Sequence, residues 1–75
     1  MKVGEALRSA RIVAGLTQRQ IAECLGVTTA FISDIENGRR VLGEKYVPLL
    51  PDHVRPSVVA AIVAEHQTAI ARLCA

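Results

Sequence analysis

The raw chemistry of an enzyme site, namely nucleophiles and bases, is present in this chain at scattered positions such as Cys24, Ser33, His53 and His66. An enzyme site would need a nucleophile, a base and an orienting group within hydrogen-bond reach of one another. No motif brings these four together in that way. Two cysteines without a CxxC or Cys/His spacing indicate neither a zinc site nor a disulfide framework. We therefore expect no enzyme activity, no metal and no cofactor.

The only adjacent pair of cations is Arg39-Arg40, which directly follows Asn37-Gly38. Such a pair can bind the phosphate backbone of a nucleic acid, and a solvated loop is the alternative. The formal net charge is only +2, so affinity for DNA has to come from a few well placed cations. Residues 1–46 hold seven Lys or Arg against five Asp or Glu, and residues 47–75 hold two of each. The positive excess therefore lies in the same part of the chain as Arg39-Arg40.

The length and composition predict one small all-helical domain. The chain has 75 residues, is rich in small aliphatic side chains, and contains one Phe, one Tyr and no Trp. No stretch alternates for long like an exposed strand. No signal peptide precedes the first expected helix and no apolar run is long enough to cross a bilayer, so we expect a cytoplasmic protein that binds no membrane.

Residues 17–38 contain the signals for two short helices joined by a tight turn. Thr17 and Gln20 have the spacing of a capping box, which predicts that a helix begins there. Gly26 can adopt the positive φ that a reversal requires. A second helix is expected over Thr28–Asn37, with Thr28 as its N-cap. Two helices around a glycine turn predict a helix-turn-helix, whose second helix can enter a DNA major groove.

Helical spacing separates an inner from an outer face in this segment. A small side chain, Ala22, is expected where the two helices cross. The inner residues are Ile21, Leu25, Val27, Ile32 and Ile35, and the outer ones are Gln18, Arg19, Thr29, Ala30, Ser33 and Asp34.

The sequence ISDIENGRR at Ile32–Arg40, together with the pattern from Glu5 to about Leu50, resembles the Cro/phage-repressor type of helix-turn-helix. The resemblance implies a lambda-repressor-like fold of four short helices plus a longer C-terminal helix. It also implies a transcriptional regulator, a repressor from a phage, plasmid or mobile-element context, that binds double-stranded DNA.

Site residues follow from the motif. The family positions that contact bases match Thr28, Thr29, Ala30, Ser33 and Asp34 in this sequence. For phosphate contacts we select Gln18, Arg19, Asn37, Arg39 and Arg40.

Three of these interpretations have alternatives. Asp34 can accept from a cytosine amino group, or it can repel phosphate or pair with Arg39 or Arg40. Phe31 can cover a thymine methyl group or a sugar, or it can pack against residues that flank the helix. The resemblance implies an ion pair between Arg11 and Glu36, with a solvated surface arginine as the alternative.

The flanking segments complete the expected fold. A first helix is expected over Val3–Ala14. A short fourth helix is expected over Gly43–Leu50, with Tyr46, Val47 and Leu50 pointing inward, although Pro48 argues against regular geometry. A long last helix is expected over Ser57–Leu73.

The last helix has a wider apolar arc than docking on a small domain needs. Its main stripe is Val59, Ile62, Val63, His66, Ile70 and Leu73. We interpret residues 1–50 as the DNA-binding part and residues 51–75 as a dimerisation element of the same domain, which would place a homodimer on a near-palindromic operator. Two alternatives remain: core packing alone, or an antitoxin-like module whose last helix binds a partner protein.

Overall fold

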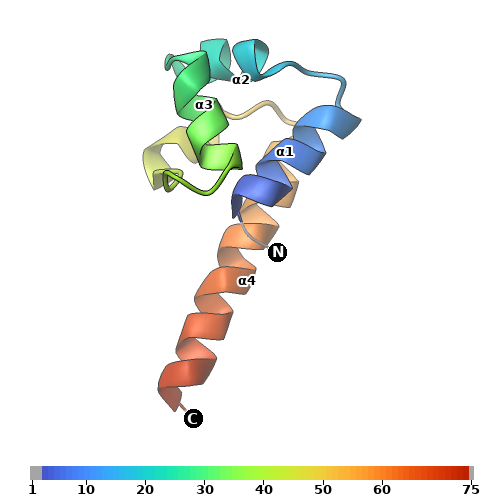
Figure 1. Cartoon of the computed structure of the whole chain (residues 1–75). Helices are drawn as coiled ribbons and strands as arrows, with labels where there is room; N and C mark the ends of the chain where they lie inside the picture. Colours follow the sequence, from blue (N-terminus) through green and yellow to red (C-terminus); the bar gives the residue numbers. More distant parts are fainter. Residues whose placement is uncertain (1–2, 75) are drawn as a thin grey trace.

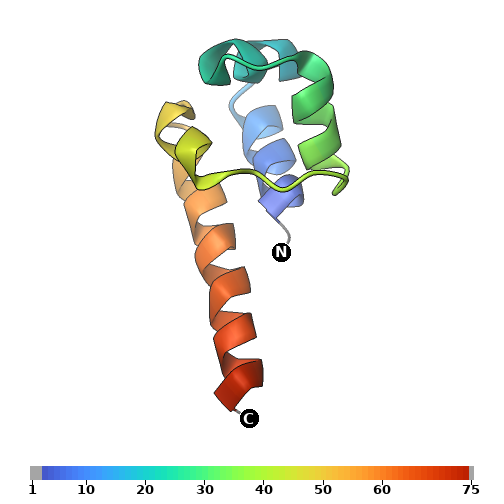
Figure 2. The same ribbon diagram turned by 90° about the vertical axis from the view of Figure 1, so that its left-hand side faces the viewer.

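The computed structural model describes the backbone of residues 3–74 and the side chains of residues 3–65. The elements in chain order are α1 (Val3–Val13), α2 (Gln18–Leu25), α3 (Thr29–Glu36), the 3₁₀ helix η1 (Glu44–Leu49) and α4 (Arg55–Cys74). This described part contains no strand, so the fold is all-helical. Elements α1 to η1 gather around the first half of α4, and the second half of α4 extends away from them (Figures 1 and 2).

Both helices of the predicted helix-turn-helix begin at the predicted residue. The Thr17 hydroxyl accepts from the Gln20 amide at 3.1 Å, and the Gln20 side chain accepts from the Thr17 amide at 2.8 Å. The Thr28 hydroxyl accepts from the Phe31 amide at 3.1 Å. These bonds satisfy amides that a helix start would otherwise leave without partners, which confirms the capping box and the second N-cap.

The turn between α2 and α3 depends on Gly26. This residue has φ of 69°, in the left-handed region that side chains with a Cβ rarely adopt. Its conformation lets the amide of Val27 donate to the carbonyl of Ala22 at 3.0 Å and close the end of α2. The chain then reverses into α3, as expected.

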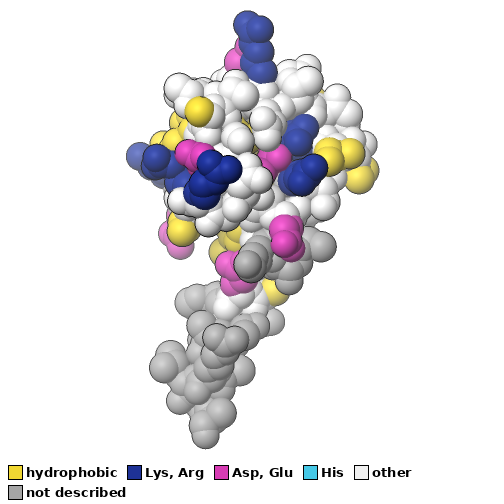
Figure 3. Space-filling model, viewed as in Figure 1, with side chains coloured by type: hydrophobic (Ala, Val, Ile, Leu, Met, Phe, Trp, Pro, Cys, Tyr) yellow, Lys and Arg dark blue, Asp and Glu magenta, His cyan; other side chains and the backbone are white. Residues whose placement is uncertain are grey.

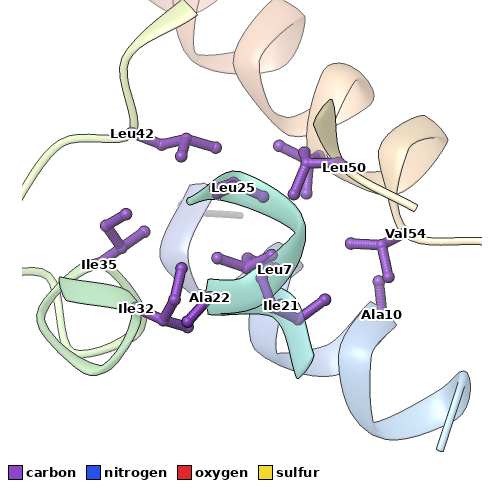
Figure 4. Close-up of a cluster of buried hydrophobic side chains, with 11 residues drawn as sticks. Leu7, Ala10, Ile21, Ala22, Leu25, Ile32, Ile35, Leu42, Leu50 and Val54 are labelled. Carbon is purple, nitrogen blue, oxygen red and sulfur yellow. The ribbon is translucent and has the colours of Figure 1, made fainter. Parts of the chain in front are cut away.

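One hydrophobic core joins α1, α2, α3 and the start of α4 with the segments on either side of η1 (Figure 4), and Tyr46 and Val47 of η1 pack against it. The six residues predicted to lie at the inner face or crossing of α2 and α3 are buried, apart from Val27, which is half-buried at the edge of the core. The core also contains Leu42 from the loop before η1 and Val54 from the residue before α4, which the spacing did not identify. Its members are Leu7, Ala10, Ile21, Ala22, Leu25, Ile32, Ile35, Leu42, Leu50, Val54 and Val58.

The boundaries of α1 and α3 differ from expectation by one residue at an end, and those of the last two elements differ in ways that matter for the fold. The fourth element is a 3₁₀ helix over Glu44–Leu49, in which Tyr46 is only half-buried. The last helix begins at Arg55, two residues before the expected Ser57. Pro56 therefore lies in the first turn of α4, where a missing amide hydrogen leaves no intrahelical bond unmade.

A close approach between α1 and α3 depends on Gly4. A Cβ atom built on Gly4 would overlap the carbonyl oxygen of Ile35 near the end of α3. Only a residue without a side chain fits there, so this glycine sets how closely the start of α1 approaches the end of α3.

Candidate nucleic-acid interface

The solvent-facing side of α3 carries a row of small and polar side chains. Thr28, Thr29 and Ala30 are exposed, and Ser33 and Asp34 are half-buried. The opposite side of the same helix supplies Ile32 and Ile35 to the core. The five residues matched to base contacts thus share the outer surface of one helix, while its inner side is fixed by packing.

A buried ion pair ties α1 to the end of α3. Arg11 Nε donates to Glu36 Oε2 at 2.9 Å, and Arg11 Nη2 donates to Glu36 Oε1 at 3.1 Å. The Glu36 side chain is only 2% exposed. Arg11 Nη1 also donates to the carbonyl of Leu16 at 3.0 Å, just before α2. One guanidinium therefore fixes three segments of the motif relative to one another.

Two of the side chains selected for phosphate contact bond within the protein. Gln18 Nε2 donates to Glu36 Oε1 at 3.2 Å, so the amide of Gln18 belongs to the Arg11–Glu36 network. Asn37 Nδ2 donates to the Ser33 carbonyl at 2.8 Å and to the Ser33 hydroxyl oxygen at 3.3 Å. Both amides stabilise the ends of α2 and α3 in this structure.

The three arginines selected for phosphate contact lie at the surface. Arg19 Nε lies 3.4 Å from Glu23 one turn further along α2. Arg39 Nη1 lies 3.7 Å from Asp34 Oδ1, which corresponds to one of the alternatives for Asp34. Such exposed pairs contribute little to stability and open at small cost, so the arginines stay available to an anion.

Phe31 is half-buried at the outer edge of α3 and contacts two groups. Its ring centroid lies 5.5 Å from that of Tyr46, with the planes at 65°. The guanidinium carbon of Arg40 lies 4.8 Å from the Phe31 centroid. Phe31 thus packs against residues that flank the helix. The sequence analysis selected Arg40 for this surface but neither Tyr46 nor Lys45. The adjacent pair Lys45-Tyr46, a cation next to an aromatic residue just after the motif, is the signal that could have indicated them.

Charge on the face in Figure 3 is mixed. Lys and Arg side chains project at several places on the globular end of the molecule, with Asp and Glu side chains among them. This distribution agrees with the small net charge and shows no single strongly basic patch on that face. Electrostatic attraction to DNA would depend on individual arginines.

The outer face of α4 leaves apolar side chains in solvent. Val59 is 39% and Val63 is 47% exposed, while Ile62 is partly buried against the core. They border a shallow groove of about 330 Å³ whose other walls are Glu44, Val47 and Pro48. The side chains of His66, Ile70 and Leu73, the rest of the expected stripe, lie outside the described residues.

Neither a metal-binding cluster nor a membrane-spanning helix is found in the described part of the chain. Its side chains form no cluster of three or more His, Cys, Asp or Glu that could hold a metal ion. Among its helices, none combines the length and apolar character needed to span a bilayer.

Comparison with known proteins agrees with this geometry. A family model described as a helix-turn-helix domain matches residues 2–75. No curated protein and no solved structure matches the chain. Because the family match covers nearly the whole sequence, and the α2–Gly26–α3 geometry is that of the motif, the chain belongs to the helix-turn-helix domain family and is consistent with its Cro/phage-repressor type.

Proposed function

We propose that this protein is a sequence-specific DNA-binding transcriptional regulator, a repressor that binds a near-palindromic operator as a homodimer in the cytoplasm. The observation that supports the proposal best is the outer row of α3. It is solvent-accessible and held rigid from behind by the core and by the Arg11–Glu36 pair. A helix with this combination can enter a major groove without rearrangement.

The small side chains on the outer side of α3 make the base contacts. The Thr29 methyl group and Ala30 suit the methyl group of thymine, and the Ser33 hydroxyl can donate to a base edge. Thr28 uses one lone pair of its hydroxyl oxygen as the N-cap, so its hydroxyl hydrogen and a second lone pair remain available to DNA. The row has no Arg, Lys, Gln or Asn. Sequence preference therefore rests on apolar contacts, water and DNA shape.

Arg19, Arg39 and Arg40 make most of the phosphate contacts, and the first backbone amides of α2 are further donors. Asn37 would contact the backbone only if one of its hydrogen bonds to Ser33 exchanged for a phosphate oxygen. Gln18 Nε2 has a second N–H, which can donate to a phosphate while the first stays on Glu36. In this structure, Gln18 stabilises the start of α2 and Asn37 stabilises the end of α3, next to the arginines and the base-contacting residues. Asp34, which pairs with Arg39, lowers the positive charge at this position.

Dimerisation would supply the affinity that one weakly charged domain lacks. Residues 1–50 would bind one half-site, and residues 51–75 would join two copies through the outer face of α4. The exposed side chains of Val59 and Val63 support this arrangement. So does the projection of α4 beyond the globule (Figure 1).

A binding measurement on random and selected duplexes tests the proposal. Repeated selection from a randomised duplex pool should yield a near-palindrome with half-sites about one helical turn apart. Affinity for the selected duplex should fall steeply as salt rises and should exceed affinity for unrelated duplexes. Recovery of no enriched sequence at low salt would contradict sequence-specific binding.

The same apolar face supports a second candidate, an antitoxin-like function in which α4 binds a partner protein and DNA binding is secondary. The two proposals differ in what covers Val59 and Val63. Sedimentation of the purified chain separates them, because a homodimer forms without any other protein and an antitoxin would need its partner.

A further inference from the structure

Two aromatic rings in contact with each other, each covered by one cation, follow the surface from α3 to η1, and we name these residues the cation–aromatic row: Arg40, Phe31, Tyr46 and Lys45. Arg40 lies over the Phe31 ring at 4.8 Å. Phe31 meets Tyr46 edge to face, with centroids 5.5 Å apart. Lys45 Nζ lies over the Tyr46 ring at 5.1 Å. All three separations lie within the range of cation–π and aromatic pair interactions.

We propose that Phe31 is a positioning residue that holds Arg40 for phosphate contact, and that Lys45, held by Tyr46, is a further phosphate contact. This inference rests on the proposed DNA-binding function. In this arrangement the cation–aromatic row binds the DNA backbone, next to the residues of α3 that contact bases. It also removes Phe31 from the residues that contact bases.

The geometry separates Arg40 from its neighbour Arg39. Arg39 faces the carboxylate of Asp34. Among the described side chains, no carboxylate forms an ion pair with Arg40 or Lys45. No paired carboxylate therefore offsets the charges of Arg40 and Lys45, and both side chains rest on rings, so both cations can contact a phosphate.

Phe31 is fixed well enough to position another group. Its amide donates to the Thr28 hydroxyl at 3.1 Å, and its ring packs against the hydrophobic core. Arg40, in contrast, is exposed in the loop that follows Gly38. A long side chain in such a loop loses rotamer freedom when it binds, and a ring that orders it beforehand reduces that cost. The face of the ring that Arg40 covers is also unavailable to a thymine methyl group.

A double-mutant cycle tests the inference with the full chain and a duplex of arbitrary sequence. Phe31→Leu and Arg40→Ala should each weaken binding about two- to fivefold, and the double variant should bind no more weakly than Arg40→Ala alone. Arg40→Ala and Lys45→Gln should each lower the salt slope by about one. Arg8→Gln, which removes an exposed cation of α1, is the matched control and should leave binding unchanged.

Each outcome has a distinct meaning. Additive losses in the double variant, or an altered sequence preference for Phe31→Leu, would overturn the positioning role. An unchanged slope for Lys45→Gln would overturn the second phosphate contact. If the wild-type chain bound no duplex even at low salt, the proposed function itself would fail.

A DNA-free readout keeps the test independent of the folding of any variant. In the wild-type chain, NMR should find the side-chain protons of Arg40 shifted upfield by the ring current of Phe31, and the shift should persist in Phe31→Tyr, which keeps a ring. Ordinary chemical shifts for these protons in the wild-type chain would overturn the contact, and the positioning role with it.

Discussion

Arg11 of α1 and Glu36 at the end of α3 form a bidentate ion pair whose two hydrogen bonds measure 2.9 and 3.1 Å. The carboxylate also accepts from Gln18 at 3.2 Å, and the guanidinium donates to the carbonyl of Leu16. Both carboxylate oxygens of Glu36 and all three guanidinium nitrogens of Arg11 are therefore hydrogen-bonded. A buried pair with this geometry fixes relative orientation, because any rotation of α3 against α1 would leave a charge without a partner.

Loss of one partner of this pair should lower the stability of the folded chain. We expect Arg11→Met to lower the free energy of unfolding by about 3 kcal/mol, because it leaves the carboxylate of Glu36 buried and unpaired. Urea denaturation followed by circular dichroism measures the change. The double replacement Arg11→Met with Glu36→Leu should recover part of the loss. A single variant as stable as the wild type would show that water reaches Glu36.

Gly4 should tolerate no larger side chain. Gly4→Ala places a methyl group against the carbonyl of Ile35 and should cost about 1–3 kcal/mol of stability, although alanine is the better helix former. Gly43→Ala is the matched control: φ is −69° there and the nearest atom, on Tyr46, would be 3.6 Å away. Thermal melting of both variants should show a lower midpoint for the first alone. Equal midpoints would mean that α1 shifts to make room.

The helix-turn-helix is the part of this fold that the sequence predicts best. Its signals are local: the capping box at Thr17, the N-cap at Thr28 and the glycine at position 26 each act within four residues. The alternation of inner and outer faces follows from helical spacing alone. The outer row of α3 is therefore predictable from the sequence.

Other features depend on contacts between distant residues. Gly4 shows no turn signal, because its role is a close approach to Ile35 far along the chain. Leu42 lies in a loop without periodicity, yet it is buried in the core. Residue type indicated that Gln18 could bind a phosphate, but its actual partner, Glu36, is set by how α2 and α3 cross. Spacing cannot supply such tertiary partners.

Asp34→Asn should raise the affinity for DNA of any sequence. The change removes a negative charge 3.7 Å from Arg39 and close to the expected phosphates, and a gain of up to about fivefold is expected for an exposed pair. Fluorescence anisotropy with several unrelated duplexes measures it. Asp52→Asn, which breaks a similar exposed pair with Arg55, is the control and should have no effect. If Asp34→Asn instead weakened binding to the selected operator alone, Asp34 would be a base contact.

Thr29→Ala should change sequence preference and leave non-specific affinity as it is. Thr29 is exposed at the first turn of α3 and has no capping role, so the substitution removes only a methyl and a hydroxyl group from the outer row. Discrimination among operator variants at one base pair should fall by about 1–3 kcal/mol. Competition with single-base operator variants gives this quantity. A uniform loss on every duplex would assign Thr29 to the DNA backbone.

Val63→Glu should yield a monomer with weak operator binding. Val63 is 47% exposed on the outer face of α4, so a charge there disturbs an interface between copies without entering the core. Val13→Glu is the matched control, since Val13 of α1 is 89% exposed and does not line the groove that Val63 borders. Sedimentation should show a dimer for the wild type and the control and a monomer for Val63→Glu, whose affinity for a half-site should equal that of the wild type. A Val63→Glu chain that remains dimeric would place the contact between copies elsewhere on the molecule, and a wild-type monomer would favour a partner protein as the occupant of this face.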